Sequence, residues 1–425
     1  MKRVFSGILA AAAALMLCVD ALAVQSGPGN FEYTRKYVSG QFNDVSGSEW
    51  YARYIEDAYN YGLFQGKSET VFAPSGHLTL GESVTLAARL MSIYRTGQAD
   101  FTESSPFYKV YADYALENGI IDSHGDYSSI VSRALFAELI YRALPAEAFP
   151  GINDVPGYAI CDVAPDSKHG SAVYALYRAG ILSGSDRFGT FFPDSGITRA
   201  ESCAVIVRLA DPAARVSTKL PASIPAEVIF QRCNEAVFLI ETFDTDGDSI
   251  RTGSGFFISE TGLAVTNLHV IEGAADATIT LANGDVCPVR GVHAVSDENN
   301  LAIISIDSGK SDWIYLSLAD SDRIETGNTV YTLGSPLGLI NTFTEGVISN
   351  KNRISEENVF IQFSAPISFG SGGSALLNTL GQVVGVTSSS YSYGQNLNLA
   401  VPVNYVKELK PGECVPLKEL RSHLS

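Results

Sequence analysis

The sequence has few cysteines, a shortage of positive charge and no second long apolar run, and each shortage excludes a class of protein. Six cysteines in 425 residues, no two of them close together, indicate neither a disulfide framework nor a CxxC metal site. The 29 basic side chains are outnumbered by 46 acidic ones and the net charge is −17, which argues against nucleic acid as a partner. Beyond residue 23 no segment approaches the roughly 20 apolar residues of a membrane helix, so we expect no membrane span there. We also expect no cofactor and no metal site.

The first residues contain the three parts of a secretory signal. Lys2 and Arg3 precede an apolar run over residues 4–17, and Ala21-Leu22-Ala23 supplies the small residues of a cleavage site. We predict a signal peptide over residues 1–23 and a secreted protein. A lipoprotein anchor at Cys18 is the alternative, but Leu17 stands before it where a small residue is expected.

Residues from about 41 to 215 have a helical pattern that occurs more than once. Residues 72–82 return with the same spacing as residues 191–201, 119 positions later, which leaves room for a degenerate middle copy. We predict repeats over residues 41–96, 105–145 and 155–215, each with a pair of helices. Because one helix pair cannot bury its apolar face alone, we expect the three to form a single all-α bundle.

Hydroxyl residues stand where the second helix of each repeat should begin. Thr79, Ser132 and Thr198 occupy this place, and Glu82 and Glu201 follow by three positions to complete a capping box in two of the copies. We predict that all three residues are helix N-caps.

The segment Thr198-Arg199-Ala200-Glu201 resembles the signature of the S-layer homology repeat. In that family three repeats form a compact bundle that binds cell-wall polysaccharide, so the resemblance implies a polysaccharide pocket at Thr198, Arg199 and Glu201 and a location at the cell wall or cell surface. Arg199 is a donor suited to an anionic sugar substituent. The first copy has Leu80-Gly81 in place of the arginine and alanine, and the second has Leu135 in place of the glutamate. The alternative is that these residues only cap and pack helices.

A linker over residues 216–228 contains Pro221 and Pro225, and the pattern changes after it. From residue 229 short β-branched segments alternate with turns, which is typical of all-β barrels. The acidic run over residues 244–248 is similar to part of a calcium loop, but it lacks the glutamate at the twelfth position. We therefore predict a hairpin turn there.

Several motifs in residues 229–410 together resemble the HtrA-like branch of the trypsin-like serine proteases. They are Gly-Ser-Gly-Phe from residue 253, Thr-Asn-Leu-His-Val-Ile from 266, Leu-Gly-Ser-Pro-Leu-Gly from 333, Glu-Gly-Val-Ile-Ser from 345 and Asn-Leu-Asn-Leu-Ala-Val-Pro from 396. The resemblance implies an all-β double six-stranded barrel with a cleft between the barrels. His269 would lie on the first barrel and the serine loop on the second.

His269 occupies the position of the general base, and the position of the orienting acid holds Asn300. An asparagine can hold an imidazole but cannot stabilise its charged form, and it can select the wrong tautomer. Asp297 is the fallback for the acid if the loop is rearranged.

The serine loop departs from the family pattern, because the position that normally holds the nucleophile falls on Gly372. A register shift of one residue would present Ser371, with the amides of Gly370 and Gly372 as the oxyanion hole. Ser374 is the fallback nucleophile, and without the shift neither hydroxyl points at His269.

The strand around Leu397 and Leu399 suggests a substrate-binding wall for small or medium apolar side chains. The leading hypothesis is a secreted, wall-anchored serine endopeptidase that cleaves surface or misfolded polypeptides. The alternatives are a pseudoprotease that binds peptides in the same cleft without cutting, and a wall-polysaccharide-binding structural protein.

Overall fold

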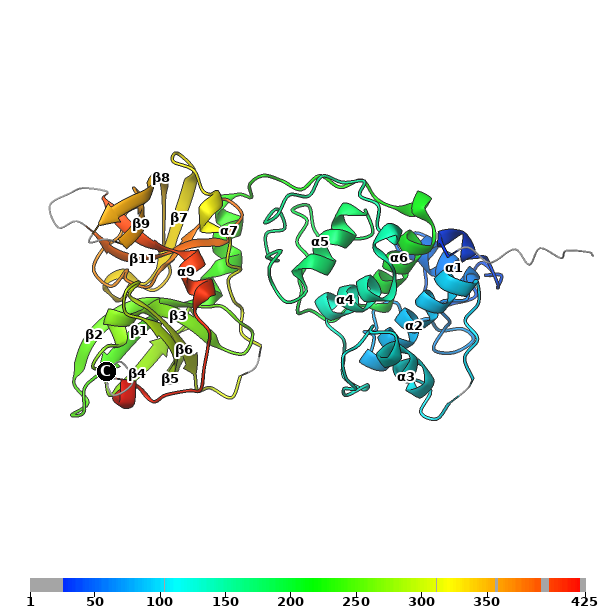
Figure 1. The fold of residues 1–425 in the computed structure, drawn as a ribbon, viewed down its shortest axis with the longest axis horizontal. Coiled ribbons are helices and arrows are strands. Elements are labelled where there is room, and N and C mark those ends of the chain that lie inside the picture. The colour runs from blue at the N-terminus through cyan, green and yellow to red at the C-terminus, as the bar shows by residue number, and fades with distance from the viewer. Residues whose placement is uncertain (1–25, 103, 311, 356–357, 391–396, 421–425) are drawn as a thin grey trace, which may run out of the picture.

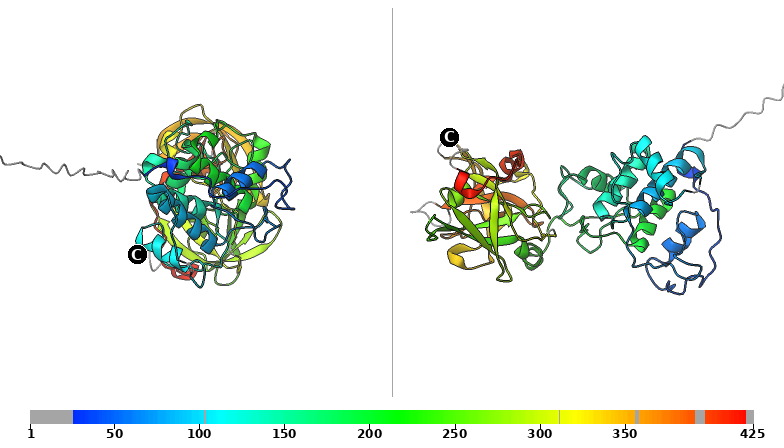
Figure 2. Two further views of the ribbon diagram at one scale, coloured as in Figure 1. Left: turned by 90° about the vertical axis from the view of Figure 1, so that its right-hand side faces the viewer. Right: turned by 90° about the horizontal axis from the view of Figure 1, so that it is seen from below.

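The computed structural model describes residues 26–102, 104–310, 312–355, 358–390 and 397–420. A helical unit comes first in the chain and two β-barrels follow, and Figure 1 shows the helical unit beside the pair of barrels. The right-hand view of Figure 2 shows the same division from below. None of the helices in this part of the chain has the length and apolar character needed to cross a lipid bilayer. The predicted signal peptide over residues 1–23 lies outside the described residues.

The helical unit contains three successive pairs of α-helices, one pair in each predicted repeat. The pairs are α1 (Ala52–Asn60) with α2 (Leu80–Thr96), α3 (Lys109–Glu117) with α4 (Arg133–Ala143), and α5 (Gly170–Arg178) with α6 (Arg199–Ala210). The sequence-based prediction of a helical region is therefore confirmed.

The second helix of each pair begins at a hydroxyl residue, as predicted. Thr79 and Thr198 accept hydrogen bonds from the backbone N–H groups of Glu82 and Glu201, and each glutamate accepts one from the backbone of its threonine. Both capping boxes are thus complete. Ser132 accepts from the N–H group of Leu135, but the leucine side chain cannot accept a hydrogen bond in return. The middle cap therefore has one of the two hydrogen bonds of a capping box.

The three segments that lead into these helices bond to one another in a ring. The N–H group of Leu78 donates to the carbonyl of Ile197 at 3.1 Å, that of Val131 to Leu78 at 3.0 Å, and that of Ile197 to Val131 at 3.3 Å. Each copy therefore donates to one neighbour and accepts from the other. This closed ring explains why the middle pair keeps its place although its sequence has diverged.

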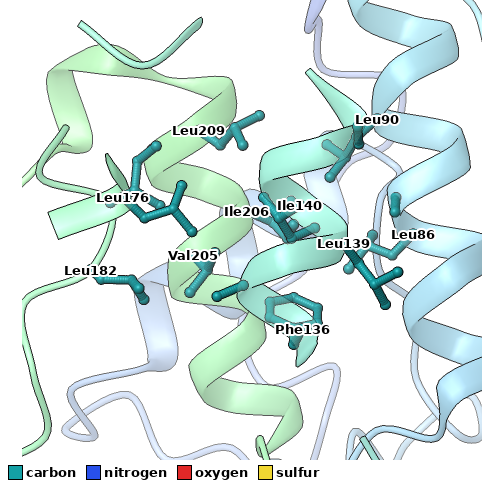
Figure 3. Close-up of a cluster of buried hydrophobic side chains, with 14 of the residues drawn as sticks. Leu86, Leu90, Phe136, Leu139, Ile140, Leu176, Leu182, Val205, Ile206 and Leu209 are labelled. Carbon is teal, nitrogen blue, oxygen red and sulfur yellow. The ribbon is translucent and has the colours of Figure 1, made fainter. Parts of the chain in front are cut away.

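One apolar core lies among the three pairs. Figure 3 shows side chains of α2, α4 and α6 in this core, among them Leu90, Ile140 and Ile206, and all three are fully buried. Burial of side chains of this size stabilises a fold by about 1.5–3 kcal/mol each. A single repeat would leave most of this surface exposed to water, so the pairs stabilise one another.

Two closed, antiparallel six-stranded barrels follow, and their sheet orders are β1-β2-β3-β6-β5-β4 and β10-β11-β12-β9-β8-β7. This confirms the predicted double barrel. The strands are β1 (Val237–Phe243), β2 (Ser249–Phe257), β3 (Leu263–Asn267), β4 (Asp276–Thr280), β5 (Val286–Ser296), β6 (Leu301–Ile306), β7 (Thr329–Gly334), β8 (Thr342–Ser355), β9 (Asn358–Phe363), β10 (Ala375–Leu377), β11 (Val383–Ser390) and β12 (Asn398–Pro402). The acidic run over residues 244–248 forms the turn between β1 and β2, where Asp244 Oδ1 accepts two backbone N–H groups.

Three short helices accompany the barrels, namely α7 (Ala226–Cys233), α8 (Leu268–Ile271) and α9 (Val403–Glu408). The helical unit contacts the barrels through polar side chains on the barrel side. Lys407 of α9 forms an ion pair with Asp166 at 2.8 Å, and the side-chain amide of Gln382 donates to the carbonyl of Ile160 at 2.9 Å. The interface therefore contains both a partly exposed ion pair and a buried hydrogen bond.

Candidate functional site

His269 and Asn300 meet at one edge of the first barrel. His269 lies in α8, directly after β3, and Asn300 ends the turn before β6. The turn puts Asn300 at a φ of 51°, a left-handed conformation that asparagine tolerates better than most residues. Its side-chain oxygen accepts the backbone N–H group of His269 at 2.9 Å, and its carbonyl accepts that of Leu268 at 3.1 Å. These bonds fix both side chains relative to each other.

The orientation of the Asn300 amide decides which imidazole nitrogen carries the proton. Because the amide oxygen already accepts the backbone N–H group of His269, the amide nitrogen faces Nδ1, at 2.8 Å. That nitrogen can only donate, so Nδ1 must accept and the proton sits on Nε2. The other pairing, Nδ1 with the amide oxygen, is longer at 3.2 Å. Partial desolvation also lowers the pKa of His269, which favours the neutral ring. In this tautomer the imidazole donates at Nε2 rather than accepting there.

The position that faces the imidazole across the cleft is Gly372. A Cβ atom on this glycine would lie 3.3 Å from Nε2 of His269 and 3.1 Å from Oδ1 of Asn267. The ungapped reading of the sequence, in which the nucleophile position falls on Gly372, therefore matches the geometry.

Ser254 of the Gly-Ser-Gly-Phe motif holds the serine loop in this register. Its N–H group donates to the carbonyl of Gly372 at 2.8 Å, and its hydroxyl donates to the carbonyl of Gly370 at 2.8 Å. The N–H group of Gly373 donates to the carbonyl of Thr387 at 2.8 Å. A shift of one residue would break all three bonds.

Neither candidate serine hydroxyl bonds to the imidazole among the described residues. Ser371 is 4% exposed and its Oγ accepts the N–H group of Ser368 at 3.1 Å. Ser374 is 1% exposed, and its Oγ has no partner and lies against Gly334. The predicted register shift is absent from this structure. The assignment of Ser371, or Ser374, as the nucleophile stays a prediction that this conformation does not support.

The other predicted cleft residues lie as follows. Asp297 is exposed and contributes its backbone carbonyl to the N–H group of Asn300, so Asn300 alone stands at the imidazole. Gly370 has a φ of 83°, and within the described residues no backbone carbonyl accepts from the N–H groups of Gly370 or Gly372. Leu397 is exposed ahead of β12, whereas Leu399 is buried within the strand. A ligand could therefore contact Leu397 but not Leu399.

An exposed apolar rim borders the serine loop, and the sequence analysis missed it. Phe369 is 90% exposed, Leu337 is 68% exposed and Leu339 is 65% exposed. The N–H group of Leu337 donates to the carbonyl of Phe369 at 2.8 Å, which ties the two segments together. Large exposed apolar side chains that adjoin a cleft are typical of binding surfaces. The Leu-Gly-Leu sequence after Pro336 was the available signal.

The three residues predicted to bind polysaccharide are divided between two hollows of the helical unit. Arg199 lines a hollow of about 570 Å³ together with Lys67, Glu82 and Arg89. Its guanidinium donates to the carbonyls of Phe72 and Gln65, at 2.9 and 2.7 Å. Arg199 therefore reaches from the third copy into the first.

Glu201 lines the second hollow, of about 460 Å³, with Arg133, Arg208 and Trp50. Arg133 forms an ion pair with Glu201 and donates to the carbonyl of Phe191 at 2.7 Å, so the second copy reaches into the third. Thr198 caps α6 through Glu201. The sequence analysis missed Arg133, because it compared each copy with the signature rather than with its spatial neighbour.

Comparison with known proteins identifies the two parts of the chain. Residues 253–386 match the family model of a trypsin-like peptidase domain, and residues 41–82 and 162–201 match the S-layer homology domain. The mitochondrial serine protease HTRA2 of Drosophila simulans is 31% identical over 271 residues, which cover 59% of this chain and 63% of HTRA2. HhoB of Synechocystis sp., which also carries a serine protease name, is 36% identical over 161 residues, or 36% of this chain and 38% of HhoB. A solved structure of the HtrA-type protease AlgW with a tripeptide is 28% identical, covers 43% of this chain and 62% of AlgW, and has a TM-score of 0.40.

The chain contains a trypsin-like peptidase domain preceded by S-layer homology sequence, which confirms both resemblances. Its peptidase part is related to the HtrA serine endopeptidases. The chain spans less than two thirds of the length of each of these relatives.

Proposed function

We propose that this protein is a surface-anchored, trypsin-like receptor that binds extended polypeptide segments in the cleft between its barrels without cutting them. The observation that carries the proposal is the pairing of Gly372 with an imidazole whose Nε2 holds the proton. Hydrolysis by a serine protease needs a hydroxyl at the first place and a base at the second. The hydroxyl is absent from the first place, and the histidine at the second donates at Nε2 instead of accepting.

The groups that would hold a peptide are present beside that pair. The N–H groups of Gly370 and Gly372 belong to a loop that uses neither in a backbone hydrogen bond among the described residues. Such donors suit a peptide carbonyl oxygen. The rim of Phe369, Leu337 and Leu339 offers apolar contact for its side chains. For an extended peptide, main-chain hydrogen bonds give affinity and side-chain contacts give specificity.

The helical unit supplies the anchor in this proposal. In a chain with a net charge of −17, the hollow at Arg199 is lined by three cations and one carboxylate, and the hollow at Arg133 by two cations and one carboxylate. Aromatic side chains border both, among them Tyr111 and Trp50. This combination suits an anionic wall polysaccharide. With a signal peptide over residues 1–23 and a peptidase domain over residues 229–410, the protein would be secreted and retained at the cell wall.

A serine endopeptidase that acts through Ser371 is the second candidate, and the serine protease names of the relatives favour it. The loop has glycines with left-handed φ angles at Gly370 and Gly373, so it could rearrange when a substrate binds. Surface proteins or misfolded chains would then be the substrates.

A fluorophosphonate probe separates the two candidates, because it reacts only with an activated serine. The parent protein is compared with His269→Ala, Ser371→Ala and Ser374→Ala variants, and binding of a fluorescent peptide pool is measured on the same samples. We expect peptide binding without labelling. Labelling that disappears in both His269→Ala and Ser371→Ala would instead establish the endopeptidase.

The anchor is tested by retention on purified anionic wall polysaccharide. Lys67→Ala removes a cation of the first hollow that pairs with Glu82 and bonds to no backbone group, and Arg199→Ala removes the buried one. We expect weaker retention for both, by about tenfold for Lys67→Ala. Lys351→Ala, on the second barrel, serves as the control with unchanged retention. Equal retention of all four proteins would contradict the anchor.

A further inference from the structure

A cavity of about 550 Å³ lies between the helical unit and the barrels. Its helical side comes from the third copy, and its barrel side comes from α7, the loop over residues 312–317 and the turn between β10 and β11. It shares no residue with the serine loop and its apolar rim, or with the two hollows of the helical unit. Small-molecule sites occur preferentially at the boundary between domains. The cavity is therefore a further place at which this protein could hold a ligand.

Apolar side chains of both units face this cavity. Phe192 of the third copy and Ile314 of the barrel loop line it, and each is 45% exposed. Phe192 has a φ of 57°, a left-handed conformation that a bulky side chain rarely adopts. The equivalent residue of the first copy is Ala73, with a φ of 60°, so the turn itself does not require an aromatic ring. The exposed ring of Phe192 is thus available to a ligand.

The charge of the cavity is mainly negative. Its described lining has one basic residue, Arg232, and five acidic ones, namely Asp162, Asp194, Glu235, Glu260 and Asp312. Arg232 already pairs with Asp186 at 2.7 Å. Within the described part of the chain none of the five carboxylates forms an ion pair, so their charge is left for a ligand or for solvent.

Four of these carboxylates are within reach of a ligand. The carboxylate of Asp162 accepts the backbone N–H groups of Phe191 and Phe192, so it serves the turn of the third copy. The other four acidic residues are exposed. Tyr315 of the barrel loop donates its hydroxyl to Oδ2 of Asp194 at 2.8 Å, which joins the two units. Oδ1 of Asp194 has no partner among the described residues and can accept from another donor.

The carboxylates of the cavity also act on one another. Partial burial raises the pKa of Glu260, Asp194 raises it further, and Lys168 opposes both effects. Burial likewise raises the pKa of the Tyr315 hydroxyl, and Asp194 and Glu260 add to this. Both shifts indicate a negative potential in the cavity. A bound cation would lower the cost of holding these charges close together.

The spacing of the carboxylates selects the kind of cation. No group of three or more candidate metal ligands occurs among the described residues, so the carboxylates lie too far apart to enclose a metal ion. An ammonium group needs only one or two carboxylate oxygens, and an aromatic face also attracts it. Methylene groups between two ammonium groups can lie along apolar side chains such as Phe192 and Ile314. A chain of alternating ammonium and methylene groups therefore fits both the charge and the apolar surface.

We propose that the cavity between the two units is a binding site for a linear aliphatic polyamine. Its ammonium groups pair with Asp194 on the helical side and with Glu260 and Asp312 on the barrel side, while its methylene groups contact Phe192 and Ile314. Because the ligand contacts both units, it holds them together. The site is separate from the peptide cleft, so it does not depend on whether that cleft binds or cuts a polypeptide.

Isothermal titration calorimetry of the whole protein with spermidine, at constant ionic strength, tests the site. Putrescine and ethylenediamine are measured beside it, and magnesium chloride supplies an inorganic dication. We expect one saturable site for spermidine and about tenfold weaker binding of ethylenediamine, because the short diamine cannot reach separated carboxylates. Putrescine should lie between them, and magnesium should not displace spermidine.

Three variants link the binding to the cavity. Glu260→Gln removes an exposed charge whose side chain makes no ion pair within the described part of the chain, and should weaken spermidine binding about threefold; adding Asp312→Asn should bring the loss to about tenfold. Phe192→Ala introduces the residue that the first copy has at this position, Ala73, and should also weaken binding. Glu345→Gln is the matched control, because it removes one exposed carboxylate from the second barrel, and it should bind spermidine as the parent does.

Several outcomes would overturn the site. Binding that does not saturate, or an equal loss in Glu260→Gln and Glu345→Gln, would show a diffuse attraction of cations to an acidic protein. Displacement of spermidine by magnesium at equal ionic strength would show the same. Unfolding in urea checks the contact with both units, since saturating spermidine should raise the midpoints of the two units together. A rise in only one unit would contradict a ligand that bridges them.

Discussion

Polar residues have different roles in the helical unit and in the barrel pair. In the helical unit, Arg199 and Arg133 line hollows and also hold backbone carbonyls of a neighbouring copy. Their loss would weaken the fold as well as any binding. In the cleft, the frame is held by Ser254 and by backbone bonds of the serine loop, and Gly372 contributes no side chain to it. A residue that carries only chemistry can be replaced without cost to folding, which explains how a trypsin-like frame can persist around an altered site.

The largest expected effect is the return of catalysis in the cleft, and it would sharpen this comparison most. Gly372→Ser together with Asn300→Asp restores a hydroxyl and a carboxylate, and the new Cβ atom requires Asn267 and His269 to move by a few tenths of an ångström. We expect fluorophosphonate labelling and peptide hydrolysis, with the introduced carboxylate contributing about 10⁴-fold over Gly372→Ser alone. Burst kinetics with an activated ester provide the measurement, and Ser371→Ala in the same background is the control without effect. Equal rates for the single and double variants would show that Asn300 does not limit the site.

The next effect concerns the pKa of His269, which partial desolvation lowers in the parent protein. Asn300→Asp places a carboxylate beside Nδ1 and should raise this pKa above that of the parent. With the lowered pKa, the parent loses stability as the pH falls from the usual histidine pKa to the lowered one, because the unfolded chain takes up the proton first. If the pKa of His269 in the folded variant exceeds the usual histidine value, the pH dependence is opposite. The variant would then lose stability as the pH rises through this pKa. NMR titration of the ring protons measures the pKa of His269 in the parent and in the variant. Asp297→Asn should leave this pKa unchanged.

A smaller effect is expected at the caps of the helical unit. Thr198→Ala removes one half of a capping box and should lower the free energy of unfolding of that unit by about 1 kcal/mol. Ser132→Ala should cost less, because Ser132 Oγ makes one bond, to the N–H group of Leu135, whereas Thr198 Oγ1 also donates to the Glu201 carboxylate. Trp50 lies in the helical unit and Trp313 in the barrels, so Trp50→Phe and Trp313→Phe backgrounds report each unit separately in urea. A loss of equal size in the barrel signal would break the comparison, since it would mean that the units unfold together.

The smallest effect is expected between the two units. Lys407→Ala removes the half-exposed ion pair with Asp166 and a hydrogen bond to Tyr158, and should cost less than about 1 kcal/mol. We expect the unfolding transitions of the two units to move apart. Lys351→Ala removes a similar pair within the second barrel and should leave their separation as it was. Identical behaviour of the two variants would indicate that Lys407 does not couple the units.

The sequence predicted most of the fold because the relevant patterns are local or repeated. The capping residues Thr79 and Thr198, the recurring segment over residues 72–82 and the alternation of short strands all depend on neighbours along the chain. The register of Gly372 opposite His269 was also readable without gaps. The rim of Phe369, Leu337 and Leu339 was not, because exposure depends on what the rest of the chain leaves uncovered.

The sequence alone determined the order of the parts, the helix caps, the double barrel and the residue types at the cleft. Only the tertiary structure decided that Arg199 hydrogen-bonds to the first copy, that Arg133 pairs with Glu201 and that Asn300 donates to Nδ1 of His269. The physical reason is that a side chain's partner, and hence its hydrogen-bonding role, is set by atoms far away in the chain.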